Sequence, residues 1–283
     1  MATETTSTSA VAWRPDVSKF AAREVVPDAL ILQASTVSGS VEGDAPAVRV
    51  AYVDDANAQF TAEADVIPES DPALNEVLVY TGKITQLVRL SNEQWRQPGT
   101  SGELSASVRR AVIKKANEAF LTQAAPTGGN VTPPAGLMNI AGTVNGGAIA
   151  DDLDGLVDLI ATLECNGSNP SRIILSPTAW ASLRKFKTAT GQATTLLGAG
   201  TNDATRTLLD LPVLVSSAMP AGAGMVIDRD AIPSAVGTVN VATSEHLYFT
   251  SDSIALRATW RIGWNVMRPN RLGKFTVTAP AAE

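Results

Sequence analysis

Few side chains in this chain of 283 residues are of the types that usually carry out catalysis or bind metal ions. The sequence contains one histidine, His246, and one cysteine, Cys165. A Ser-His-Asp or Cys-His arrangement would depend wholly on that single imidazole, and a zinc site normally needs several Cys or His ligands. A single cysteine also cannot form an internal disulfide. The sequence therefore predicts a protein that is not an enzyme and holds no metal ion.

Glycine-rich and acidic stretches do not indicate a cofactor site either. Two Gly-Lys pairs, at 82–83 and 273–274, lack both the earlier glycine and the following Ser or Thr of a phosphate-binding loop. The adjacent carboxylates of Asp54 and Asp55 could bind a hard cation, but a solvated turn explains them better. We predict no cofactor.

The most regular feature of the sequence is a pair of long alternating segments. From Ile254 to Val266 every second residue is apolar, and most of the residues between them are polar or small. Side chains alternate between the two faces of a strand, so the pattern predicts a strand with one buried and one wet face. At about 3.3 Å per residue this strand would span roughly 43 Å, well beyond the usual length. A similar segment runs from Leu74 to Leu90. Together they predict an antiparallel platform closed by both halves of the chain.

A hairpin is predicted before the first long strand. Residues 48–52 and 60–66 alternate, and the turn-prone residues 54–57 lie between them. The hairpin carries few large apolar residues, and a two-stranded ribbon is only marginally stable in water. It is therefore expected to rest on another surface. Trp13 and Phe20 lie in the irregular N-terminal segment and are predicted to anchor that segment on a neighbour.

Helical spacing of apolar residues predicts a long helix from about residue 101 to 123. We expect Trp260 and Trp264 to be buried where the terminal strand meets this helix. Proline and glycine between 126 and 134 end the helix and form a linker.

The region from about 135 to 250 has shorter elements. Helices are predicted near 151–163 and from Ser176-Pro177 onward, where a capping serine precedes a proline at the first helical position. Short strands are predicted at 172–175, 213–215 and 225–227. Alternating strands and helices indicate an α/β layer distinct from the long-strand platform, so the fold class is α+β.

The net charge of −6 is unevenly distributed. Residues 37–71 contain eight acids and one base, a net charge of −7, whereas residues 253–274 contain five bases and no acid. Two solvated faces would explain these runs, but opposite charge also favours contact between the acidic segment of one subunit and the basic segment of another. The candidate contact residues are Glu63, Asp65, Arg257, Arg261 and Arg268.

The sequence indicates neither a membrane protein nor a sequence-specific nucleic-acid-binding protein. No apolar stretch approaches the length of about 20 residues that crosses a bilayer. The first twelve residues lack the basic and apolar regions of a signal peptide. Aromatic residues make up 5% of the chain and do not interleave with basic ones, which argues against a sequence-specific nucleic-acid reader.

The order of these parts resembles the major capsid protein of tailed bacteriophages, which has the Hong Kong 97-type fold. Three short stretches are also similar to that family: Gly136-Leu137-Met138-Asn139, residues 175–180 (LSPTAW) and Leu211-Pro212-Val213. The resemblance implies an N-terminal arm at 1–33 and an extended E-loop at 34–72. It further implies a peripheral domain with a long spine helix at 73–125 and 247–283, and an α/β axial domain at 126–246.

The resemblance also implies a function. The chain would assemble with itself, as pentamers and hexamers, into the icosahedral shell that encloses the double-stranded DNA of a tailed phage. Assembly would take place in the cytoplasm of the bacterial host, with a portal and a separate scaffolding protein. The resemblance also allows for a decoration protein on the shell. The packaged DNA would be contacted without sequence specificity.

Two departures from the family bear on assembly. Some relatives join subunits through an isopeptide bond from an E-loop lysine, but this chain has no lysine between Lys19 and Lys83. Other relatives carry a long N-terminal scaffolding segment, whereas here the E-loop is expected from residue 34. Two alternatives stay open: an encapsulin shell of the same fold that encloses enzymes, and, more distantly, a hydrolase that uses carboxylates.

Overall fold

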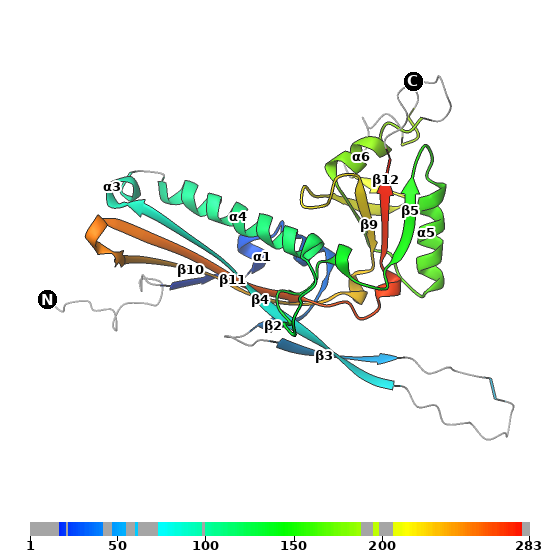
Figure 1. Cartoon of the computed structure of the whole chain (residues 1–283), viewed down its shortest axis with the longest axis horizontal. Helices are drawn as coiled ribbons and strands as arrows, with labels where there is room; N and C mark the ends of the chain where they lie inside the picture. The colour runs from blue at the N-terminus through cyan, green and yellow to red at the C-terminus, as the bar shows by residue number, and fades with distance from the viewer. Residues whose placement is uncertain are drawn as a thin grey trace.

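A computed structural model describes most of the chain, as two six-stranded sheets with helices packed against them (Figure 1). The described residues are 17–20, 22–41, 47–54, 60–61, 73–97, 100–187, 195–197 and 206–278. The mixed content and the two separate sheets confirm the predicted α+β class.

The first sheet holds the long strands, and its longest pairings join β10 to β11 and β11 to β4. Its strands follow the order β1-β10-β11-β4-β3, and β2 pairs with β10 off this path. Their bounds are β1 Val17–Phe20, β2 Thr36–Val41, β3 Ala47–Asp54, β4 Ala73–Ser91, β10 Pro233–Tyr248 and β11 Ser253–Trp264. β4 and β11 are the two predicted long strands, and they pair antiparallel from Thr81 opposite Gly263 to Ser91 opposite Ser253.

Helix α4 (Thr100–Thr122) covers one face of this sheet. Its apolar stripe and the even-numbered side chains of β11 from Leu256 to Trp264 form one buried core. The ring of Trp264 meets Phe120 of α4 edge to face, with centroids 5.3 Å apart, and only 1–2% of Trp260 and Trp264 is exposed. The predicted helix and the predicted burial of both tryptophans are confirmed.

The end of α4 is fixed by the stretch that follows the linker. Asn139 donates from its side-chain amide to the carbonyls of Thr122 and Gln123, at 3.0 and 2.8 Å, and so caps the helix. A Cβ on Gly136 would lie 2.5 Å from the backbone nitrogen of Gln123, so only glycine fits there. Part of the family-like stretch at 136–139 is thereby explained.

Strand β10 was not predicted, and it forms the centre of the first sheet. It pairs with β1 and β2 along one edge and with β11 along the other. A bulge between Val236 and Val239 leaves the carbonyl of Gly237 to accept a hydrogen bond of 3.0 Å from the indole of Trp260.

The second sheet, in the order β5-β12-β9-β6-β8-β7, forms the α/β layer. Its bounds are β5 Val144–Ile149, β6 Arg172–Leu175, β7 Thr207–Leu208, β8 Leu211–Val215, β9 Ala223–Ile227 and β12 Gly273–Val277. Helices α5 (Asp154–Cys165) and α6 (Pro177–Leu183) pack their apolar sides on it, and Ser176 caps α6 by accepting from the amide of Ala179. The helices and short strands predicted in this region are confirmed.

Seven short helical segments complete the described chain. Four lie next to the first sheet or in the linker, and three are single turns between strands. Their bounds are α1 Ala22–Val25, α2 Leu30–Ala34, α3 Asn92–Trp95, η2 Leu137–Asn139, η3 Arg229–Ala231, η4 Phe249–Ser251 and η5 Pro269–Arg271.

Sheet membership differs from the predicted division of the chain at four places. β1, in the predicted arm, and β2, in the predicted E-loop, both pair with β10 and so belong to the first sheet. The boundary expected between 246 and 247 falls inside β10, which belongs to the first sheet with β11. β12 lies within the C-terminal range assigned to the long-strand platform, but it pairs with β5 and β9 in the second sheet. The single-turn helix η5 (Pro269–Arg271) lies between β11 and β12, so the chain passes from one sheet to the other there.

The predicted hairpin falls only partly within the described residues. β3 pairs with the first half of β4, from Ala47 opposite Tyr80 to Asp54 opposite Ala73, while residues 55–59 and 62–66 of the expected turn and second strand lie outside the described residues. Of the expected second strand only Phe60 and Thr61 are described, and they lie outside any strand. The β3–β4 ribbon projects away from the rest of the chain (Figure 1).

Candidate functional site

The face of the first sheet that points away from α4 carries a cluster of basic side chains. In β4 the exposed residues alternate with those that pack on the core, so Lys83 and Arg89 point away from α4. Strand register places Lys83 opposite Arg261, and Arg257 opposite Leu87. Directly paired residues share a face of the sheet, so these four side chains lie together on one surface. We call Lys83, Arg89, Arg257 and Arg261 the basic face.

The neighbouring strand positions in the described part of this face, namely those paired between β4 and β11 and the 240–244 part of β10, carry no acidic residue. Arg261 donates to the hydroxyl of Thr81 at 3.1 Å, and Arg89 stacks over the ring of Tyr248 at 4.7 Å from its centroid. Arg257 and Lys83 are exposed and form no ion pair with any described residue. Such a surface favours binding of an acidic partner.

The predicted contact residues fall into three groups. Arg257 and Arg261 lie on the basic face, whereas half-buried Arg268 donates to the carbonyl of Val53 in its own β3, at 3.4 Å. Phe20 pairs through its backbone with Val239 of the same chain. Trp13, Glu63 and Asp65 lie outside the described residues.

Sequence reasoning did not select Lys83 or Arg89 as contact residues. Both occupy polar positions in the alternating pattern of the first long strand. This alternation was the one sequence signal that they lie on the exposed face. It became informative only when strand register placed them beside the arginines of β11.

The projecting β3–β4 ribbon has uncovered apolar side chains. Val53 and Leu74, which face each other across the ribbon, are 44% and 82% exposed, and the Phe60 side chain is fully exposed. The only ion pair on the ribbon among described residues joins Arg49 and Glu76 at 2.7 Å. The ribbon therefore has apolar surface but no described part of its own chain to bury it.

A second uncovered apolar site lies where β10 turns into β11. Leu247 and Phe249 are 59% and 83% exposed there. His246, the single histidine, is also exposed at this turn. No described acid or base is bonded to it, so the structure offers no catalytic partner within that range.

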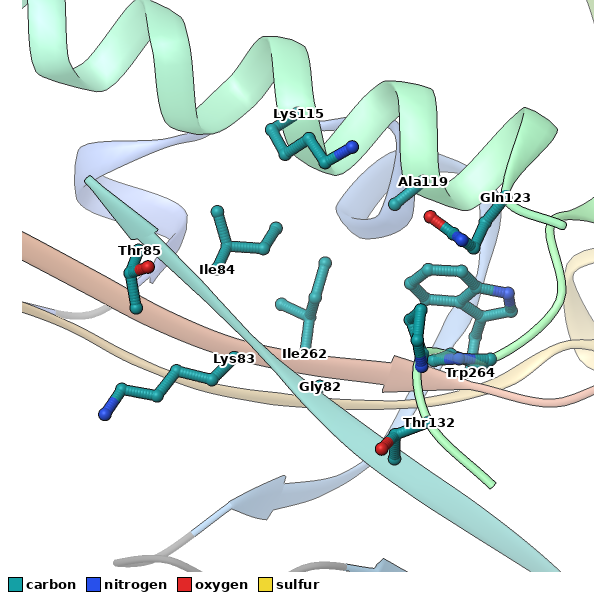
Figure 2. A pocket seen from close by; sticks show the side chains of 12 residues that line it. Gly82, Lys83, Ile84, Thr85, Lys115, Ala119, Gln123, Thr132, Ile262 and Trp264 are labelled. Carbon is teal, nitrogen blue, oxygen red and sulfur yellow. The ribbon is translucent and has the colours of Figure 1, made fainter. Parts of the chain in front are cut away.

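A cavity of about 400 Å³ opens between α4, β4 and the linker (Figure 2). Ile84, Ile262 and Trp264 form its apolar wall, as Figure 2 shows. Two lysines flank the β4 edge: Lys115 extends from α4 on one side, and Lys83 extends from β4 on the other. No acidic residue lines the cavity. It therefore suits an apolar group attached to a negatively charged segment.

Enzymatic and membrane-spanning sites do not emerge from the described part of the chain. No group of three or more His, Cys, Asp or Glu residues is placed there to hold a metal ion. None of the described helices is both long and apolar enough to cross a membrane. The notable features are surfaces, and these suit protein–protein contact.

Comparison with known protein families identifies the group. The profile of the phage capsid family matches residues 22–277, nearly the whole chain. The chain belongs to the phage capsid family. A capsid protein is a structural subunit of a shell, which accounts for extended elements whose surfaces are left uncovered in a single chain.

Solved capsid structures share its fold. A structure from Gordonia phage Cozz has a TM-score of 0.69 at 17% sequence identity and covers 90% of this chain and 87% of its own. One from Microbacterium phage Oxtober96 has a TM-score of 0.68 at 14% identity, covering 88% and 91%. The capsid of a native GTA particle has a TM-score of 0.66 at 16% identity, covering 88% and 90%.

These matches confirm the Hong Kong 97-type fold and the resemblance from which it was expected. A comparison with curated protein sequences gives no significant match. None of these findings supports the encapsulin or the hydrolase alternative.

Proposed function

We propose that this capsid protein is the major shell subunit of a tailed phage and assembles as pentamers and hexamers around double-stranded DNA. The observation that carries the proposal is the complementarity of two surfaces of one chain. The ribbon exposes the apolar side chains of Val53 and Leu74 beside an acidic stretch of the sequence, and the exposed Arg257 and Lys83 of the basic face form no ion pair with a described residue. The acidic, partly apolar segment and the exposed basic side chains of Arg257 and Lys83 are therefore complementary in charge.

The contact between copies would join these two surfaces. Glu63 and Asp65 of one subunit would face Arg257 of the next, with Arg261 and Lys83 beside it. Arg268 is held to its own ribbon through the carbonyl of Val53 and would help to position the far part of the ribbon. Trp13 and Phe20 would anchor the N-terminal arm on a neighbour.

The domain names of the family follow the two sheets in this proposal. The peripheral domain would consist of the first sheet with α4, and the axial domain of the second sheet with α5 and α6. The arm would be residues 1–33, and the E-loop would extend through 34–72 onto the paired part of β4. β10 would then belong to the peripheral domain and β12 to the axial domain.

The proposal includes partners that the family implies. Shell assembly would take place in the host cytoplasm with a portal and a separate scaffolding protein, and the mature shell, with or without a decoration protein, would be part of the virion. The chain would act as a structural protein without enzymatic activity. DNA would be enclosed without sequence-specific contacts.

The test is particle formation by the purified chain, followed by sedimentation and cryo-electron microscopy. We expect closed shells, or rings of five and six subunits. Shells isolated from infected cells should release double-stranded DNA after protease treatment. A stable monomer at high micromolar concentration, with or without a scaffolding protein, would contradict the proposal; shells that contain protein cargo and no DNA would contradict the genome-packaging part.

A further inference from the structure

The side chain of Phe60, the largest apolar residue between Tyr52 and Leu74, is fully exposed. A solvent-exposed aromatic ring in an extended segment marks a contact when a matching cavity exists elsewhere. The cavity between α4, β4 and the linker is the candidate, because its wall of Ile84, Ile262 and Trp264 is apolar. Its volume of about 400 Å³ is within the range of cavities that bind compact apolar groups.

Charge supports the same pairing. No lysine or arginine occurs between Arg49 and Lys83, whereas Asp54, Asp55 and Glu63 lie close to Phe60 in the sequence. The cavity has the opposite character: Lys115 lies beside it on α4, Lys83 extends from the same β4 edge toward the opposite face of the sheet, and no described residue of its lining is acidic. Complementary charge fixes the register of a contact and steers its formation.

The ring cannot reach the cavity of its own chain. The cavity borders β4 at Gly82, and the ribbon ends at Ala73, nine residues away, or roughly 30 Å along the strand. Asp54 pairs with Ala73, and six residues from Asp54 to Phe60 span at most about 21 Å. The cavity must therefore be that of a second copy.

We propose that Phe60 of one subunit inserts into the cavity formed by α4, β4 and the linker of a neighbouring subunit, with Lys115 and Lys83 binding the acids beside it. This inference rests on the proposed shell function and names the anchor of the contact. It also fits the basic face. Glu63 follows Phe60 by three residues, which span at most about 11 Å, and Arg257 lies four residues, roughly 13 Å, from Arg261, the register partner of Lys83.

The first experiment is crosslinking within assembled shells. In a Cys165→Ser background, Thr61→Cys is combined with Thr132→Cys, which lies at the cavity, and is treated with a short bismaleimide. Thr61→Cys with Thr162→Cys, an exposed position on α5 outside the cavity, is the matched control. We expect covalent dimers and larger species from the first pair and only background from the second.

The second experiment measures the protein concentration at which shells form. Phe60→Ala should raise it about tenfold or more, whereas Phe60→Leu should largely retain assembly because leucine keeps most of the apolar area. Lys115→Glu should also raise it severalfold. Lys114→Glu, the same charge change one residue earlier on α4 but outside the cavity, should change it less than twofold. Circular dichroism of each unassembled variant confirms that its subunit is folded.

The outcomes separate the two proposals. If the parent forms shells but the Thr61–Thr132 pair crosslinks no more than the control, or Lys114→Glu and Lys115→Glu behave alike, the anchor is wrong and the shell function stands. If the Cys165→Ser parent and the wild type form no shells or rings at all, the proposed function fails and the anchor fails with it.

Discussion

Trp264 connects the first sheet to α4 and to the segment that follows α4, and truncating its side chain should destabilise these contacts. Its ring packs edge to face on Phe120 of α4, its indole nitrogen donates to the carbonyl of Ala135 in the linker at 2.8 Å, and its backbone ends β11. Only 2% of the residue is exposed. Loss of a fully buried tryptophan costs about 3–5 kcal/mol of unfolding free energy.

The local contacts place Trp264→Ala in the upper part of that range. An edge-to-face aromatic pair adds about 0.5–1.5 kcal/mol, and a carbonyl left without its donor adds a further penalty of about 1 kcal/mol. We therefore expect Trp264→Ala to lower the free energy of unfolding by about 4–5 kcal/mol. Trp264→Phe keeps the ring contact and loses the hydrogen bond, so it should cost about 1–2 kcal/mol.

Urea titration of unassembled subunits, followed by near-ultraviolet circular dichroism, measures these values. Phe249→Ala, at a site 83% exposed, is the control and should change the free energy by less than about 0.5 kcal/mol. A double-mutant cycle of Trp264→Ala with Phe120→Leu should give a coupling of about 0.5–1.5 kcal/mol. A loss below about 1 kcal/mol for Trp264→Ala, or no coupling with Phe120, would refute the packing of β11 against α4.

Three other predictions concern the sheet and the shell. Gly263→Ala should lower the free energy of unfolding by about 2–3 kcal/mol, because the new Cβ would lie 2.2 Å from the carbonyl oxygen of Tyr80. Gly102→Ala is the control: its Cβ has open space in α4, and it should raise the melting temperature slightly. Equal melting temperatures of the two variants would contradict the strand register. Mature shells boiled in detergent should release a single band near 29.5 kDa, since the stretch between Lys19 and Lys83 contains no lysine for an isopeptide bond, and a ladder that survives boiling and reductant would show another cross-link. Replacing Glu63 and Asp65 of the acidic segment by lysine should weaken assembly as judged by light scattering, and reversing Arg257 and Lys83 to glutamate should partly restore it. Each exposed pair contributes only about 0–1 kcal/mol, so a single reversal should have little effect, and absence of rescue by the combined reversal would exclude this pairing.

Local patterns in the sequence determined the elements whose own side chains decide their burial. The alternation from Ile254 to Val266 predicted β11 and the face on which its tryptophans lie, and helical spacing predicted α4. The short strands β6, β8 and β9 were predicted equally well, because apolar runs between turns are buried by their own composition. The spacing of apolar side chains along the sequence is sufficient to predict these elements and their buried faces.

β10 escaped prediction for a physical reason. The bulge between Val236 and Val239 shifts the phase of alternation, so Ser234 and Val236 face α4 before it, while Val239 and Val241 face α4 after it. No constant period of two therefore runs through the strand. Its burial comes from neighbouring strands on both edges, which the local sequence does not reveal.

Pairing and register were decided by the tertiary structure alone. Lys83, Arg257 and Phe60 can be read in the sequence. The sequence does not reveal which strands lie side by side or where a cavity opens. β3 pairs with β4, and β12 joins the second sheet, because backbone hydrogen bonds join any two strands that the fold brings together. The basic face and the cavity beside Trp264 exist only once β4, β11 and α4 have packed together.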